Sequence, residues 1–158
     1  MNSLMEQLLG AIKPIRVLHF RLFEVRFLTT KKGEAVIVLI YHIALEDEQW
    51  KAAANILSKS LNATIVGRCR GKMLVSDSPN GEIITETLAI NGREFTYFQT
   101  EGAFSQPNAG VCEKMIAWAL DVTAGSQDHD LLELYCGGGT FTAPLSQVIY
   151  YGFVCLHE

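Results

Sequence analysis

The sequence has little of what marks metalloproteins, secreted proteins or membrane proteins. Its four cysteines lack C-x-x-C spacing, so they fit neither a zinc site nor a disulfide framework and favour a reducing compartment. The longest apolar run, AVIVLIY, is far shorter than the roughly 20 residues of a membrane span. The N-terminal segment contains Glu6 and has no signal-peptide cleavage site. We therefore expect a cytoplasmic protein without a metal ion or a membrane contact.

The sequence also lacks an excess of basic residues. Lys and Arg number 13 against 17 Asp and Glu, and the formal net charge is −4. The chain as a whole has no electrostatic footprint for nucleic acid, so any such contact must come from a local patch. The 49% of hydrophobic residues is enough for a buried core and argues against disorder.

Hydrophobic periodicity predicts an α+β unit in the first part of the chain. A helix is expected over residues 2–12, ended by Pro14, and another over 46–61. Residues 22–30 alternate, with Phe23, Val25 and Phe27 on one face, and they pair with a buried strand over 35–42. Strands at 63–68, 73–77 and 82–90 follow, and a turn at Asn91 and Gly92 forms a second hairpin with 93–99. We expect an antiparallel sheet in this unit.

The pattern then changes to that of an open parallel α/β sheet. Asn108 can cap a helix with an apolar stripe, and a strand over 131–135 leads through glycines into another helical turn. This order of helix, strand, glycine loop and helix is how such a sheet begins. We place the boundary near Gly102, with a central α+β domain over 1–101 and the first part of a Rossmann-like domain over 102–158.

The glycine loop CGGGTF indicates a nucleoside cofactor. Glycine lets the backbone approach a ligand closely and tolerates positive φ. The spacing is G-x-G, shorter than the six-residue dinucleotide form, and Glu133 lies within the preceding strand. This pattern suits a cofactor without a pyrophosphate, and S-adenosylmethionine (SAM) is the natural candidate. Alternatively, the glycines only form a tight turn between a strand and a helix.

Three segments together resemble the RNA 5-methyluridine methyltransferases, and most closely the bacterial-type tRNA (uracil-5-)-methyltransferases. They are FSQPN at 104–108, the helix end WALDVTAGS at 118–126, and LLELYCGGGTF at 131–141. The likeness extends upstream over about residues 1–147. The family resemblance implies a Rossmann-like SAM-dependent catalytic domain, preceded by a domain that contacts RNA.

The resemblance also implies residues that bind SAM. Gln106 matches the family's glutamine and Tyr135 the tyrosine before the glycine loop, in which Gly137 and Gly139 leave the backbone open. Thr140 stands where the family commonly has asparagine; it keeps an oxygen for hydrogen bonding and loses the amide donor. Without the resemblance, Gln106 could simply tie down a turn, and Tyr135 could be a half-buried aromatic residue at the end of a strand.

Four residues are candidates for binding RNA. The resembling family presents an aromatic residue and a histidine to the T-loop of tRNA at the positions of Phe23 and His42, and stacking on such rings is how unpaired bases are recognised. Arg68 and Arg70, with Lys72, would alternate along one strand face and could meet phosphates. Alternatively, Phe23 lies in the core, His42 has its own partner, and the basic residues form an ordinary solvated face.

The resemblance implies an enzyme whose chemistry lies elsewhere. Methylation at uracil C5 needs a thiolate that adds to C6 and a base that removes the C5 proton, and in the family the cysteine and the glutamate lie far downstream. We expect a monomeric part of a tRNA (uracil-5-)-methyltransferase, inactive alone; alternatively, the chain is a non-catalytic RNA-binding module. Glu158, 21 residues after Gly137, could bind the ribose hydroxyls of the cofactor.

Overall fold

The computed structural model describes residues 2–148 and 153–156. The chain divides into two compact units, Met1–Ile84 and Thr85–Glu158, each with its own hydrophobic core. The second unit begins before Gly102 because Leu88 and Ile90 pack against the helix that follows Asn108. The boundary expected near Gly102 concerns the start of the catalytic domain and stays a prediction.

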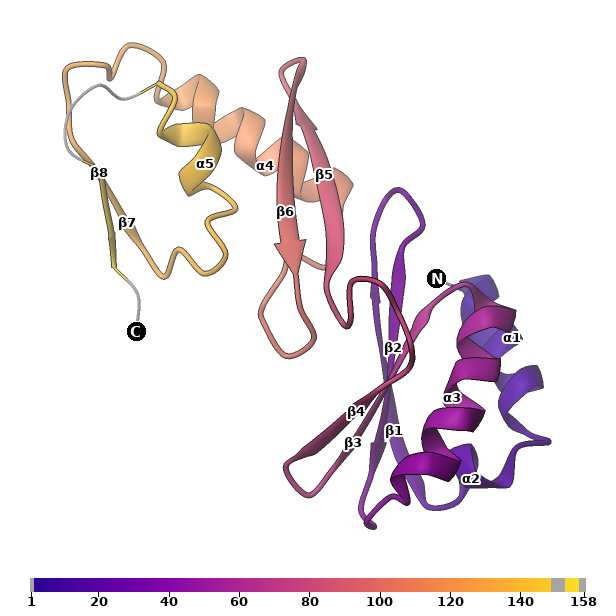
Figure 1. The fold of residues 1–158 in the computed structure, drawn as a ribbon. Coiled ribbons are helices and arrows are strands. Elements are labelled where there is room, and N and C mark those ends of the chain that lie inside the picture. Colours follow the sequence, from indigo (N-terminus) through magenta and orange to yellow (C-terminus); the bar gives the residue numbers. More distant parts are fainter. Residues whose placement is uncertain (1, 149–152, 157–158) are drawn as a thin grey trace. The chain divides into compact units, whose positions relative to one another are not determined.

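The first unit is a four-stranded sheet with helices on one face (Figure 1). Its elements, in chain order, are α1 (Asn2–Ile12), α2 (Arg16–His19), β1 (Leu22–Thr29), β2 (Ala35–Tyr41), α3 (Asp47–Leu61), β3 (Thr64–Cys69) and β4 (Lys72–Val75). The predicted helices and strands of this unit are present, with ends that differ by a few residues.

The sheet is mixed, which corrects the expected antiparallel sheet. Its order is β1-β2-β3-β4, and β2 runs parallel to β3, from Val36 beside Thr64 to Tyr41 beside Cys69. The two outer pairs are antiparallel. The reason is the connection: α3 carries the chain back to the end of the sheet where β2 began, and such a helical crossover joins parallel strands.

Both faces of the central strand β2 are buried. Ile37, Leu39 and Tyr41 face the helices in the larger core, while Val36 and Val38 contact Val66, Ile84 and others on the opposite face. All but Ile40 of the seven residues of β2 are buried. The nearly continuous apolar run in the sequence therefore reflects a strand covered on both sides.

The indole of Trp50 is the centre of the larger core. Trp50 is fully buried, and its ring lies so close to Gly67 that a Cβ there would be 2.5 Å from Cζ2. The Trp50 Nε1–H donates to the hydroxyl of Tyr41 at 3.2 Å, and that hydroxyl donates to the carbonyl oxygen of Leu18 at 2.7 Å. Burial raises the pKa of Tyr41 to about 12, so this hydroxyl stays protonated and can make both bonds.

The second unit combines a hairpin, a helix and a two-stranded parallel sheet. Its elements are β5 (Ile84–Ile90), β6 (Arg93–Gln99), α4 (Ala109–Val122), β7 (Leu131–Leu134), α5 (Thr142–Leu145) and β8 (Phe153–Leu156). The predicted cap is confirmed, because Asn108 Oδ1 accepts from the Val111 N–H at 3.0 Å. Strands β7 and β8 pair in parallel. Glu158 lies outside the described residues.

Helix α4 is apolar on more than one side. Its buried face consists of Cys112 and Ile116, which pack on the β5–β6 hairpin. Val111, Met115 and Trp118 belong to the stripe predicted from the sequence, yet they are 50%, 42% and 67% exposed. Within the described chain, the predicted stripe therefore lies at the surface of α4 and not in the core.

The described residues contain no helix with the length and apolar character of a membrane span.

The contact between Trp50 and Gly67 predicts the effect of a single methyl group. In Gly67→Ala the new Cβ would overlap the buried indole, and overpacking of this kind costs about 1–3 kcal/mol. We expect a lower midpoint in thermal or urea unfolding. The matched control is Gly10→Ala in α1, where a Cβ meets nothing within 4 Å and helix propensity favours alanine by up to about 1 kcal/mol. Equal midpoints for Gly67→Ala and the wild type would show that the indole does not require this glycine.

Candidate functional site

The loop after β7 has an unusual backbone. Tyr135, Gly137 and Gly139 all have positive φ, at +57°, +53° and +74°. A Cβ at Gly137 would meet nothing within 4 Å, so the protein leaves room for a side chain there. Glycine is favoured at this position because of its positive φ. Tyr135 adopts this region without being glycine, which costs about 1–3 kcal/mol. The loop therefore presents an open, strained backbone.

Side chains of β6 and β7 hold this loop in place. The Tyr97 hydroxyl donates to the carbonyl oxygen of Thr140 at 2.9 Å, and the Thr142 hydroxyl donates to Glu133 Oε2 at 2.7 Å. Burial raises the pKa of Tyr97 to about 12, so it remains a donor throughout the physiological range. Glu133, noted in the sequence as an acidic residue within the strand, thus anchors the start of α5.

The structure brings Gln106 and Thr140 together. Both line one small cavity of about 20 Å³, with Tyr97 and Cys112 among the other lining residues. That volume is enough for about one water molecule and far below the space a nucleoside needs. Tyr135 does not line it and is 78% exposed.

A larger depression also borders the glycine loop. It has a volume of about 340 Å³ and is lined by Gly138, Gly139 and Phe98 among others. Phe98 is 77% exposed, and the sequence analysis missed it. A signal was present: Phe95 and Tyr97 pack in the core, so the alternation of β6 places Phe98 on the face where polar residues are usual.

The loop residues fit SAM in chemistry. Gln106 offers an amide donor and acceptor, Thr140 a hydroxyl, and Tyr135 an exposed aromatic face, while the backbone at Gly137 is unobstructed. The second unit holds 2 of the 13 Lys and Arg and 9 of the 17 Asp and Glu, a formal charge of −7. That charge suits a sulfonium cation.

At one end of the four-stranded sheet, Phe23 and His42 lie in contact. Their ring centroids are 4.2 Å apart with an interplanar angle of 63°. Phe23 is 64% exposed, so the alternative that it lies in the core is wrong. The register shifts between Leu22 and Glu24, so Phe23 is the additional residue of a β-bulge. The expected face of Phe23, Val25 and Phe27 is corrected accordingly: Leu22 packs with the latter two.

Arg68 and Arg70 lie near the same end of the sheet. Arg68 is exposed on β3 beside Ile40, and the parallel pairing of Tyr41 with Cys69 brings Arg70 to the end where His42 lies. Arg70 and Gly71 form the tight turn to β4, both with positive φ.

The expected shared face with Lys72 is wrong. Lys72 begins β4 after the turn and pairs with Cys69, whose side chain faces the helices. The Lys72 Nζ forms an ion pair with the carboxylate of Asp47, the first residue of α3, at 2.5 Å. The side chain of Lys72 therefore lies beside α3.

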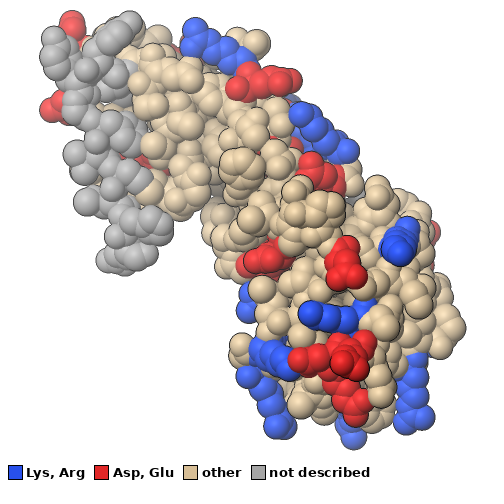
Figure 2. All heavy atoms as spheres, in the orientation of Figure 1, with Lys and Arg blue, Asp and Glu red and all other residues tan. Residues whose placement is uncertain are grey.

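Two further residues, Arg16 and Phe20, flank this end, and Phe20 was not singled out in the sequence. The Arg16 guanidinium lies 5.3 Å from the ring centroid of Phe20, which is 46% exposed and directly follows α2. The (i, i+4) spacing of a cation and an aromatic ring was the available signal. The first unit holds 11 of the 13 Lys and Arg and 8 of the 17 Asp and Glu, a formal charge of +3. Blue side chains are plentiful over this unit in Figure 2.

The cysteines whose side chains are described are poorly suited to act as nucleophiles. Cys69 and Cys112 are buried. Burial, reinforced by Glu113 and Glu86, raises the pKa of the Cys112 thiol and thereby disfavours its thiolate. No group of three or more His, Cys, Asp or Glu among the described residues could hold a metal ion.

Comparison with solved structures gives only distant similarity. The chain aligns with a protein from Streptococcus mutans assigned as a SAM-dependent methyltransferase at a TM-score of 0.38 and 11% identity, covering 98% of this chain and 44% of that one. A score this low carries no argument about function.

Comparison of sequences is far more specific. The family model for tRNA (Uracil-5-)-methyltransferase matches residues 1–152. The tRNA/tmRNA (uracil-C(5))-methyltransferase of Ectopseudomonas mendocina is 50% identical over 145 residues, and that of Acinetobacter baylyi is 49% identical over 146. Each match covers 92% of this chain and 39% of the relative, so the chain spans about two fifths of the length of these relatives. The chain belongs to the tRNA (uracil-5-)-methyltransferase family.

Proposed function

We propose that this chain is the part of a SAM-dependent tRNA (uracil-5-)-methyltransferase that contacts the T-loop of tRNA and begins the cofactor site. Family membership over residues 1–152 supports the reaction class. The observation that carries the RNA contact is the exposed pair of Phe23 and His42, since unpaired bases are recognised by stacking on exposed aromatic rings. A cytoplasmic location and a monomeric state stay predictions.

In this proposal the Rossmann-like domain begins near Gly102. SAM would supply the methyl group as an electrophile. Gln106 and Thr140 would orient the cofactor through hydrogen bonds, Tyr135 would pack against it, and the backbone at Gly137 and Gly139 would approach it. The fixed loop reduces the ordering needed on binding, because Tyr97 and Glu133 already hold it.

The described residues supply binding and not the covalent steps. Addition of a thiolate to uracil C6 needs an ionised, accessible cysteine, and Cys69 and Cys112 are buried. The relatives are longer than the part that matches this chain. We propose that the additional part of such enzymes contributes the nucleophile and the base that removes the C5 proton. The chain alone would then bind RNA without methylating it.

Loss of either ring of the aromatic pair should weaken RNA binding. We expect Phe23→Ala and His42→Ala each to lower the affinity for a T-arm stem-loop, because stacking is worth about 1–3 kcal/mol per base, or about 5- to 150-fold. Fluorescence anisotropy with a labelled T-arm measures this. Ile56→Ala, at a 65% exposed position on α3, is the control and should bind as the wild type does. An anticodon stem-loop bound as tightly as the T-arm would reject the assigned substrate.

The backbone of the glycine loop should decide SAM binding. In Gly137→Ala and Gly139→Ala a side chain is forced to positive φ, which costs about 1–2 kcal/mol, so affinity should fall about tenfold. Gly138→Ala is the matched control, because Gly138 is not among the residues with positive φ and its Cβ would meet nothing within 4 Å. Isothermal titration with SAM measures all three. The loop assignment fails if Gly138→Ala loses as much affinity as its neighbours do.

A further inference from the structure

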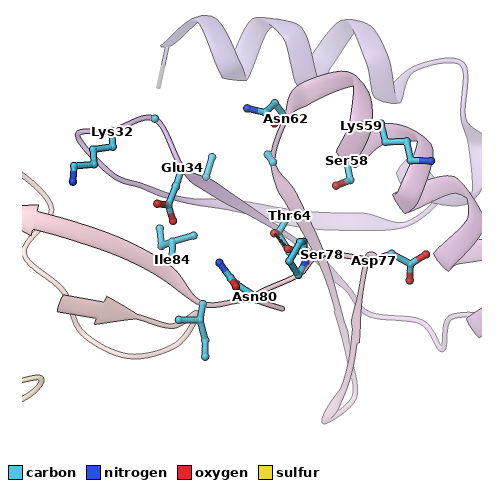
Figure 3. Close-up of a pocket in the computed structure, with 15 residues that line it drawn as sticks. Lys32, Glu34, Ser58, Lys59, Asn62, Thr64, Asp77, Ser78, Asn80 and Ile84 are labelled. Atoms are coloured by element: carbon cyan, nitrogen blue, oxygen red, sulfur yellow. Dashed lines mark hydrogen bonds between the residues drawn. The ribbon is translucent and has the colours of Figure 1, made fainter. Parts of the chain in front are cut away.

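The first unit contains an open pocket at the end of the sheet opposite Phe23 and His42 (Figure 3). It has a volume of about 430 Å³ and lies where β2 and β3 begin, where α3 ends, and beside the loop after β4. Thr64 and Ser78 lie at its inner wall, joined by a hydrogen bond of 3.0 Å between their hydroxyls. Nothing in the family resemblance assigns a function to this pocket.

The charged groups around the pocket differ in whether they are already engaged. Asp77 accepts from Asn55 Nδ2 at 2.6 Å, and Glu34 also takes part in interactions within the protein. Within the described part of the chain, by contrast, the ammonium groups of Lys32 and Lys59 have no hydrogen-bond or ion-pair partner. The pocket is therefore lined by two carboxylates, of which Asp77 is hydrogen-bonded to Asn55, and by two ammonium groups without a partner among the described residues.

Neutral donors of the pocket reinforce these cations. The side-chain amides of Asn62 and Asn80 reach the pocket from the end of α3 and from the loop after β4 (Figure 3). Neither amide has a partner among the described residues. Figure 3 shows Lys32 and Lys59 extending to opposite sides of the pocket, an arrangement that suits successive phosphodiesters of one RNA strand more than a single compact anion.

The C-terminal end of α3 would ordinarily repel an anion, because the last carbonyl oxygens carry partial negative charge. Here the chain turns back on itself at Asn62, which has a left-handed backbone. The backbone N–H groups of Asn62 and Ala63 both donate to the carbonyl oxygen of Ser58, the latter at 3.2 Å. That carbonyl is therefore engaged, and Lys59 in the last turn offsets the remaining charge.

We propose that this pocket binds the phosphate backbone of the same RNA whose unpaired bases stack on Phe23 and His42. The proposal rests on the proposed function. The two sites lie at opposite ends of β2, which spans about 20 Å at 3.3 Å per residue, a distance that a few nucleotides can cross. The aromatic end would select the loop, and Lys32 with Lys59 would add affinity that does not depend on sequence.

The salt dependence of RNA binding tests this proposal. The slope of log K against log salt concentration falls by about 0.7–0.9 for each lost phosphate contact, so Lys32→Ala/Lys59→Ala in the full chain should lower it by about 1.5. The affinity for a T-arm stem-loop should fall about tenfold or more at low salt. Both lysines are exposed, so we expect unchanged folding, which thermal unfolding checks. Lys114→Ala on α4, an exposed lysine outside the pocket, is the matched control and should leave slope and affinity unchanged.

The outcomes separate the pocket from the proposed function. If the wild-type chain does not bind the T-arm at all, the proposed function fails. If it binds and Phe23→Ala weakens it, while the two lysine substitutions leave the slope unchanged, only the pocket proposal is overturned. A titration with pyrophosphate distinguishes RNA from a free phosphate compound as the ligand of the pocket. The proposal would also be overturned if pyrophosphate bound tightly and the lysine variants lost this binding while their affinity for RNA stayed unchanged.

Discussion

The arrangement of the first unit depends on the indole of Trp50 and the glycine it covers. Because Gly67 has no side chain, α3 can lie directly on β3, and the indole N–H can reach Tyr41. Tyr41 in turn bonds to Leu18 at the end of α2. These contacts join four elements, α2, β2, α3 and β3, and the exposed Phe20 and His42 directly follow α2 and β2. A buried hydrogen-bonded network of this kind gives the neighbouring surface a defined geometry.

The two units have opposite charge, and the proposed ligands have opposite charge as well. The unit with formal charge +3 carries the aromatic pair and the pocket with two available lysines, which suits a polyanion. The unit with −7 carries the glycine loop, which suits a sulfonium cation. The net charge of −4 conceals this division, since averaging over the chain removes the local excess that RNA binding needs.

Local signals predicted the elements, and long-range constraints explain what they missed. Residues 2–12 and 93–99 and the Asn108 cap follow from periodicity and capping within a few residues of sequence. The parallel pairing of β2 with β3 could not be deduced in this way, because no local pattern states which strands are neighbours. The bulge at Phe23 and the turn at Arg70 likewise depend on pairing register. The family resemblance predicted that Phe23 and His42 both contact RNA. That their rings touch each other could be learned only from the structure.

Among the described residues, Tyr135 is one of five non-glycine residues with positive φ, the others being Arg21, Asn62, Arg70 and Asn91. A tight turn alone would be satisfied by glycine at that position, which avoids the cost of positive φ. Here a large aromatic residue takes that conformation and leaves its side chain 78% exposed, so it gains little from burial in return. Gly137 and Gly139 show that the loop already uses glycine where φ is positive. The exposed ring therefore gains little from the folded chain, which agrees with the proposed role of this aromatic surface in holding the cofactor.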